Sequence, residues 1–175
     1  MRNNRPIQGY RLYDHLKGEE GTVEARSLNE RFEMHEEAVR AVTEDPLESK
    51  ARGKDQKKEK KAKRKAIKHA LKAQNDSEAR RPRVFVLDFD GDMQASQVDQ
   101  LREEVSAILP VVGEADKVLR RLESGGGVVH GYGLAASQLM RLKDAGITLT
   151  ISVDKVAASG GYMMACVGDE IIAAP

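Results

Sequence analysis

The sequence has few of the residues that mark several common protein classes. Its one cysteine, Cys166, cannot form a disulfide within the chain. It has no tryptophan and only seven other aromatic residues, four Tyr and three Phe, which argues against a surface that stacks nucleic-acid bases. No run of residues approaches the ~18 consecutive apolar positions of a membrane-spanning helix. The chain therefore matches neither a disulfide-stabilised scaffold nor a base-stacking protein, and these 175 residues predict no membrane span.

Charge is nearly balanced over the whole chain, with a net value of +1, but it is distributed unevenly. Residues 50–72 hold 12 Lys or Arg and two acidic residues, a local net charge of +10. This run offers almost no apolar surface to bury, so we interpret it as a solvated linker with some helical character. Two binding functions stay open for it, to nucleic-acid phosphates or to anionic lipid headgroups. It contains no aromatic residue and no nucleic-acid motif, so we expect no nucleic-acid partner.

Residues 1–80 are interpreted as an N-terminal extension. Residues 1–24 show no clear periodicity, and we expect them to be loosely ordered. A helix is predicted over about 27–43, with Ser27 and Glu30 at the spacing of a capping box. Its sizeable side chains recur at steps of three and four, and they are Leu28, Phe32, His35, Val39 and Val42. This stripe fits either self-association or packing against another part of the protein.

Strands and helices alternate through residues 81–175. Strands are predicted at 84–89, 117–122, 147–153 and 170–173, and helices at 95–109, at 132–143 and directly after Ser159. The order β-α-β-α-β-α-β predicts an α/β domain with parallel strands and right-handed crossovers. Because the last strand ends almost at Pro175, we expect this domain to be incomplete at its C-terminus.

Two glycine-rich turns follow adjacent predicted strands. One contains Ser159 and Gly160, and the other is Ser124-Gly125-Gly126-Gly127. Both turns would lie at the carboxyl edge of a parallel sheet, where open α/β sheets bind ligands. Ser159 fits two interpretations at this stage, an ordinary helix cap or a nucleophile placed at a helix N-terminus.

Amide hydrolysis by a hydroxyl group requires a nucleophile, a base and hydrogen-bond donors for the oxyanion. If Ser159 is the nucleophile, the N–H groups of Gly126, Gly127 and Gly160 are the candidate donors. No base is evident. Asp154 and Lys155 lie too close in sequence to reach back to Ser159, and His130 reads more naturally as a polar residue at a helix start.

Two other catalytic motifs are absent. The glycine loop lacks the Gly-Lys-Ser/Thr ending of a phosphate-binding Walker A motif. Ala157 occupies the position of the first glycine in the Gly-x-Ser-x-Gly elbow of α/β-hydrolases. We predict no cofactor and no metal ion.

The stretch Val153-Asp-Lys-Val-Ala-Ala-Ser-Gly-Gly-Tyr-Met-Met-Ala-Cys166 resembles the signal peptide peptidase A family of serine peptidases. Segments 86–89, 119–124 and 129–139 resemble it too, and the similarity extends over most of the chain from about Leu28. The resemblance implies a Clp/crotonase-like fold, here a parallel β-α-β spiral core. It also implies a Ser–Lys dyad in which Ser159 is the nucleophile and the lysine base lies downstream of Pro175.

The resemblance has further implications. The family usually has Ser-Pro-Gly-Gly at the oxyanion loop, and Gly125 replaces the proline here, a change expected to loosen the loop. It also implies a bacterial inner-membrane location, a membrane span outside these 175 residues, a homo-oligomer, and a peptide or membrane-protein-derived substrate. The basic run 50–72 would then lie near anionic lipid.

The sequence thus favours a membrane-associated serine endopeptidase, inactive in this 175-residue form because it lacks the lysine. Two alternatives remain. One is a non-enzymatic module that binds anionic lipid or nucleic acid through the basic run. The other is a crotonase-like enzyme that acts on acyl-CoA.

Overall fold

The computed structural model describes residues 8–14, 23–45, 82–175 and part of the basic run, namely 52–53, 55, 57–59, 61–62 and 64–66. The chain divides into two compact units. One unit comprises Met1–Pro6 and Asn29–Arg81, and the other comprises Ile7–Leu28 and Pro82–Pro175. The second unit contains the sheet and both glycine-rich turns.

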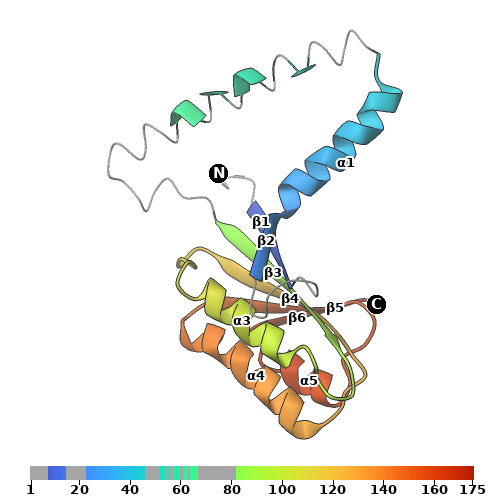
Figure 1. Ribbon diagram of the computed structural model, residues 1–175, viewed down its shortest axis with the longest axis vertical. Coiled ribbons are helices and arrows are strands. Elements are labelled where there is room, and N and C mark those ends of the chain that lie inside the picture. The colour runs from blue at the N-terminus through green and yellow to red at the C-terminus, as the bar shows by residue number, and fades with distance from the viewer. Residues whose placement is uncertain are drawn as a thin grey trace. The chain divides into compact units, whose positions relative to one another are not determined.

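A six-stranded sheet forms the second unit, in the order β2-β1-β3-β4-β5-β6 (Figure 1). Five strands run parallel, and only β2 is antiparallel, to β1. The predicted α/β class with a parallel sheet is confirmed. The strands are β1 (Gln8–Asp14), β2 (Val23–Ser27), β3 (Arg83–Gly91), β4 (Lys117–Ser124), β5 (Thr148–Val153) and β6 (Glu170–Ala173).

The expectation of loose order for residues 1–24 is wrong for residues 8–14 and 23–24. Residues 8–14 form β1, which pairs in parallel with β3, and residues 23–24 begin β2. Leu12 is buried in the core, while Arg11 on the opposite face of the strand forms an ion pair with Asp88 of β3. The alternating pattern of residues 8–14 is too short to predict a strand from local sequence. The segment forms β1 because pairing with β3 supplies partners for its backbone hydrogen bonds. The other residues of this segment lie outside the described ranges.

Three helices lie on one side of the sheet, α3 (Val98–Ile108), α4 (Val129–Asp144) and α5 (Gly160–Ala165) (Figure 1). Side chains at alternate strand positions point toward them, as expected for a sheet with one covered face. The residues that form this core include Leu87, Phe89, Leu122, Leu149 and Ile151 from the strands and Leu101, Val105, Leu139 and Leu142 from the helices, and each is 2% exposed or less. The opposite face of the sheet carries mainly polar side chains.

One ion pair is buried within this core. Arg120 of β4 and Glu104 of α3 are each 1% exposed, and their closest N–O distance is 3.0 Å. The Arg120 guanidinium also lies over the Phe89 ring, 5.2 Å from its centroid. Burial raises the pKa of Glu104 and lowers the pKa of Arg120. The pair joins α3 to β4 at one defined position.

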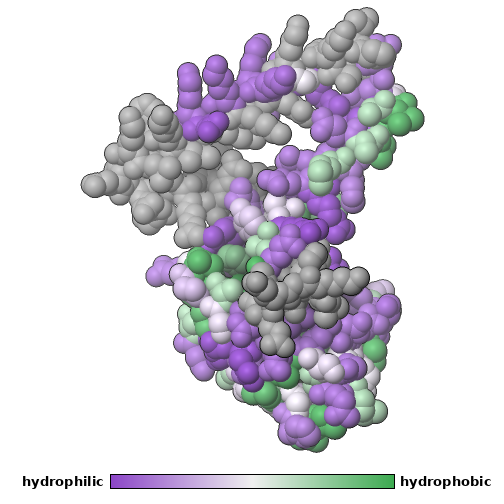
Figure 2. Space-filling view, viewed as in Figure 1, coloured by the Kyte–Doolittle hydropathy of each residue, from purple (hydrophilic) through white to green (hydrophobic). Residues whose placement is uncertain are grey.

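The first unit contains α1 (Leu28–Thr43), which begins and ends within one residue of the helix predicted at 27–43. Arg40 bonds Glu36 and Glu44 along its surface, the i,i+4 pairs that support an exposed helix. No residue of α1 is buried, and Val42 is 88% exposed. Hydrophobic surface is visible along this helix in Figure 2. Phe32 and Val39 of the predicted stripe are exposed as well, whereas Leu28 at the helix start is half-buried.

No helix in the described ranges has both the length and the apolar content required to cross a bilayer.

Candidate active site

Ser159 has an unusual backbone conformation, with φ 49° and ψ −116°. Few residues other than glycine adopt a positive φ, and such conformations cost about 1–3 kcal/mol and concentrate at functional sites. The Ser159 side chain is exposed and makes no capping hydrogen bond to α5. The capping interpretation left open by the sequence therefore fails, because the helix does not use this hydroxyl.

The turn that carries Ser159 is fixed to the end of β4. The Ser124 N–H donates to the Val156 carbonyl and the Ala158 N–H donates to the Ser124 carbonyl, both at 2.9 Å. These bonds extend the β4–β5 pairing as an isolated parallel bridge between Ser124 and Ala157. The nucleophile candidate therefore follows directly after a segment held to the sheet by backbone hydrogen bonds.

Two glycines after Ser159 are required by close packing. A Cβ atom on Gly160 would overlap the Tyr132 ring of α4. A Cβ atom on Gly161 would lie 2.9 Å from the Ser124 Cβ. Because both positions exclude a side chain, α5 starts directly against β4 and α4.

The glycine loop after β4 lies against Ser159, as the sequence predicted. Gly126 has φ +89°, and a Cβ atom there would lie 2.6 Å from the Ser159 Cβ and 2.8 Å from the Ala158 carbonyl oxygen. Gly127 is as restricted, since its Cβ would overlap the Met93 backbone. Gly125, in contrast, has open space around it. The structure thus brings Gly126, Ser159 and Gly160 together at the carboxyl edge of the sheet.

The three predicted oxyanion donors differ in their hydrogen bonds. The Gly126 N–H donates to the Ser124 hydroxyl oxygen at 3.0 Å, so it is occupied within the protein. The sequence did not indicate this bond. Within residues 82–175 no hydrogen bond involves the N–H of Gly127 or Gly160. Of the three predicted donors, Gly127 and Gly160 are therefore the two whose N–H groups have no hydrogen-bond partner within residues 82–175.

None of the three candidate bases, Asp154, Lys155 and His130, forms a hydrogen bond with Ser159 among the described contacts. Lys155 bonds both carboxylate oxygens of Glu123, at 2.8 and 2.9 Å, and this hydrogen bond raises the pKa of Lys155. A lysine held as the ammonium ion cannot accept a proton. Asp154 accepts a hydrogen bond from Ser152. His130 is exposed in the first turn of α4, and among the described contacts it makes no hydrogen bond with Ser159.

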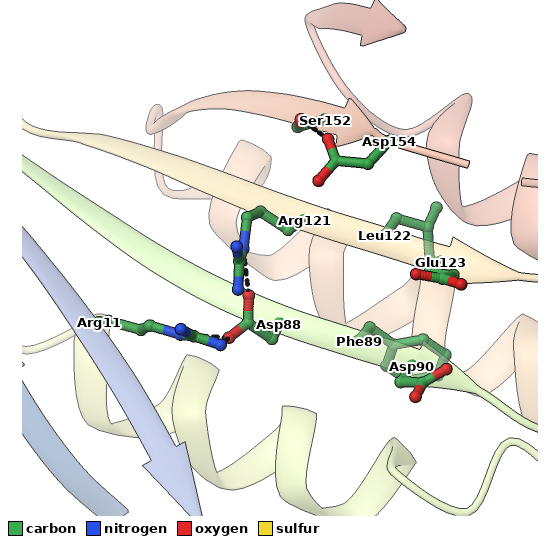
Figure 3. Close-up of a pocket in the computed structure, with 9 residues that line it drawn as sticks. All are labelled: Arg11, Asp88, Phe89, Asp90, Arg121, Leu122, Glu123, Ser152 and Asp154. Atoms are coloured by element: carbon green, nitrogen blue, oxygen red, sulfur yellow. Dashed lines mark hydrogen bonds and ion pairs between the residues drawn. The ribbon is translucent and has the colours of Figure 1, made fainter. Parts of the chain in front are cut away.

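A separate hollow of about 240 Å³ lies on the polar face of the sheet (Figure 3). Asp88, one of the residues that line it, lies between Arg11 and Arg121 and forms an ion pair with each. Ser159 does not line this hollow, so it is distinct from the candidate active site. Within the described residues no group of three or more His, Cys, Asp or Glu side chains is placed to hold a metal ion.

These features define a class of protein, a parallel α/β domain with an exposed, conformationally strained serine opposite a glycine loop. The chain belongs to peptidase family S49. Residues 9–139 match the N-terminal region of this family, and residues 141–175 match the peptidase family S49 region that follows it. The sheet is consistent with the Clp/crotonase-like fold that the sequence resemblance implied.

Several curated relatives are similar to this chain. A protein named "Probable protease SohB" from Haemophilus influenzae is 54% identical over 162 residues, which are 92% of this chain and 46% of the relative. A "Probable protease SohB" from Buchnera aphidicola subsp. Schlechtendalia chinensis is 66% identical over 94 residues, 54% of this chain and 31% of the relative. A "Putative protease SohB" from B. aphidicola subsp. Baizongia pistaciae is 44% identical over 158 residues, 89% of this chain and 45% of the relative.

The chain thus spans less than half the length of these relatives. No solved structure matches it.

Proposed function

We propose that this chain supplies the nucleophile and the oxyanion-binding loop of a serine endopeptidase that works through a Ser–Lys dyad. The observation that carries the proposal is the combination at Ser159 of a strained backbone, an exposed hydroxyl without a capping bond, and direct contact with the glycine loop. A serine held at an energetic cost, whose hydroxyl serves no structural purpose, fits a nucleophile. Membership of a peptidase family supports peptide bonds as the target.

The chemistry follows from these positions. The Ser159 Oγ attacks the substrate carbonyl carbon while a neutral lysine accepts the hydroxyl proton. The carbonyl oxygen becomes an oxyanion, for which the N–H groups of Gly127 and Gly160 are the donors. Collapse of this intermediate transfers the lysine's proton to the leaving amine and leaves an acyl-enzyme on Ser159. Water then hydrolyses the ester with the same lysine as base.

The proposed base is a lysine located after Pro175. Lys155 is held protonated by Glu123, and the region matched in the Haemophilus influenzae relative is only 46% of that protein. A base that remains neutral near pH 7 requires an environment that lowers its pKa, and Lys155 has the opposite environment. The 175-residue chain is accordingly proposed to be inactive alone.

Labelling with a fluorophosphonate tests this proposal. The 175-residue chain should not react, whereas a chain extended past Pro175 with its natural sequence should be labelled at Ser159, as located by mass spectrometry. Ser159→Ala in the extended chain should abolish both labelling and peptide hydrolysis. An extended, folded chain that fails to label would refute the proposal. Continued activity after Ser159→Ala, with binding of CoA thioesters, would indicate a crotonase-like acyl-CoA enzyme instead.

We further propose that the protein acts as a homo-oligomer at the bacterial inner membrane on a peptide or membrane-protein-derived substrate. Two features support this proposal, the exposed apolar stripe of α1 and the local charge of +10 over residues 50–72. Basic residues near an anionic bilayer contribute about 1 kcal/mol each. Sedimentation with vesicles containing anionic lipid should be lost when the basic residues within 57–65 are neutralised. Unchanged sedimentation would exclude this role for the basic run.

A further inference from the structure

We propose that Ser124 and Tyr132 are positioning residues that hold the oxyanion loop through a relay of hydroxyl groups. Both side chains are buried, at 2% and 0% exposure, and among the described hydrogen bonds neither hydroxyl group is joined to Ser159. The inference deepens the proposed function and rests on it.

The relay connects the glycine loop to the loop that follows β3. The Gly126 N–H donates to the Ser124 Oγ at 3.0 Å, and this oxygen lies 2.6 Å from the Tyr132 Oη. The Tyr132 hydroxyl in turn donates to the Asp92 carbonyl oxygen at 2.7 Å. Ser124 Oγ has a second, longer contact of 3.2 Å to the Gly91 carbonyl oxygen.

The number of protons determines the direction of this relay. The two hydroxyl groups carry one proton each, and a carbonyl oxygen can only accept. Tyr132 donates its proton to Asp92, so Ser124 donates to Tyr132 through the shortest contact rather than to Gly91 through the longest. The result is a continuous series of hydrogen bonds from Gly126 through Ser124 and Tyr132 to Asp92. Each bond polarises the next in the same direction, which strengthens all of them.

The same residues also contact the turn that carries the nucleophile. The backbone of Ser124 bonds Val156 and Ala158, and the ring of Tyr132 fills the space that a Gly160 side chain would need. Ser124 and Tyr132 therefore contact both the Gly126 side and the Gly160 side of the site. Removing a hydroxyl should change the position of the loop without removing the nucleophile or an oxyanion donor.

Amide hydrogen exchange of Gly126 in the 175-residue chain tests the relay without any catalysis. Ser124→Ala removes the acceptor and should accelerate Gly126 exchange about fivefold. Tyr132→Phe leaves the acceptor in place but removes its polarisation, so the acceleration should be smaller. Ser137→Ala and Tyr10→Phe each remove a hydroxyl bonded elsewhere, to the Leu134 carbonyl and to Gln8, and should not change it. Gly126 exchange that is unchanged in Ser124→Ala would overturn the relay.

Steady-state kinetics of the extended chain test the positioning role. A loosened oxyanion loop weakens an interaction made only in the transition state, so kcat should fall about tenfold while KM changes less than about twofold. This loss is below the roughly 10²–10³-fold cost of deleting an oxyanion donor. The double variant Ser124→Ala/Tyr132→Phe should lose no more than Ser124→Ala alone, since the two residues act in one chain.

The outcomes separate this inference from the proposed function. A kcat for Ser124→Ala equal to that of Ser137→Ala, or additive losses in the double variant, would overturn the positioning role while leaving the peptidase intact. An extended parent that hydrolyses no peptide would overturn the proposed function and the catalytic part of this inference together. In that case a faster Gly126 exchange in Ser124→Ala would still establish the relay. Thermal unfolding of each variant identifies any loss that arises from unfolding alone.

Discussion

Three glycine-to-alanine substitutions provide a quantitative test of the contact between the glycine loop and Ser159. Gly126 combines a positive φ of +89° with a Cβ position 2.6 Å from the Ser159 Cβ. Gly146, after α4, has a similar φ of +75° but open space around it. Gly125 has open space and a φ outside the positive range. The three positions therefore separate backbone strain from steric contact within one chain.

The expected losses of unfolding free energy follow directly. Gly125→Ala should change it by less than about 0.5 kcal/mol, as for other exposed sites. Gly146→Ala should cost about 1 kcal/mol, because alanine at a positive φ is strained. Gly126→Ala should carry that strain together with about 1–3 kcal/mol for the overlap with Ser159, a total of about 2–4 kcal/mol. The overlap involves the backbone carbonyl of Ala158 as well, so a change of rotamer cannot relieve it.

Urea denaturation of the 175-residue chain, monitored by circular dichroism, measures these differences. The order should be Gly126 worst, Gly146 intermediate and Gly125 nearly neutral. In the extended chain, Gly126→Ala should also slow fluorophosphonate labelling of Ser159, whereas Gly146→Ala should not. Equal losses at Gly126 and Gly146 would refute the contact between the glycine loop and Ser159, and with it the geometry of the candidate site.

Three further predictions concern Ser159 and two ion pairs. Ser159→Gly should abolish labelling and yet stabilise the chain by about 1 kcal/mol in urea denaturation. The reason is that relief of about 1–3 kcal/mol of backbone strain exceeds the entropy cost of introducing glycine. A destabilised variant would show that Ser159 is not strained. Arg120→Met should lower the free energy of unfolding by about 3–5 kcal/mol, because it leaves Glu104 buried without its cation. Adding Glu104→Leu should restore most of this stability. An equal loss in the double variant would contradict the buried ion pair. Burial acts to raise the pKa of Asp116, but hydrogen bonds from Arg83 and backbone N–H groups outweigh it and lower the pKa. Because the pKa is lower in the folded state, the Asp116 carboxylate stabilises the protein at pH values above its unfolded-state pKa, and this stabilisation is lost as the pH falls below about 4. The free energy of unfolding, measured from pH 7 to pH 3, should therefore decrease less in Asp116→Asn than in the parent. Identical pH profiles for the two proteins would refute this.

The elements between residues 82 and 175 could be predicted because their local signals agree with one another. The strand predicted at 170–173 coincides with β6, and α4 extends the predicted helix 132–143 by a few residues at its start. The helix predicted at 95–109 is shorter, since α3 begins at Val98. The preceding residues form a turn in which Ala95 has φ 55° and Asp92 accepts hydrogen bonds from Ser96. Such turn chemistry competes with a helix start and is invisible to periodicity.

Contacts that depend on the assembled fold could not be predicted. β1 has a weak strand pattern, and its place in the sheet depends on pairing with β3 and on the ion pair between Arg11 and Asp88, which are 77 positions apart. At the site, the sequence predicted that the two glycine turns meet, because parallel strands place their carboxyl ends at one edge. It did not predict that the Gly126 N–H bonds Ser124, since this requires the buried hydroxyl of Tyr132 beside it.

The strain at Ser159 persists because the surrounding contacts determine its conformation from both sides. Ser124 fixes the backbone on the N-terminal side through Ala158, and α5, starting against Tyr132, fixes it on the C-terminal side. Gly126 packs directly against the Cβ atom of Ser159. All of these contacts come from residues 82–175, so this part of the chain itself sets the arrangement of Ser159 and the glycine loop. An oxyanion site built in advance costs no reorganisation at the moment of reaction. Under the proposed mechanism, the base needs only to place a neutral amine beside Ser159, and its loss should remove proton transfer while leaving the arrangement of Ser159 and the glycine loop intact.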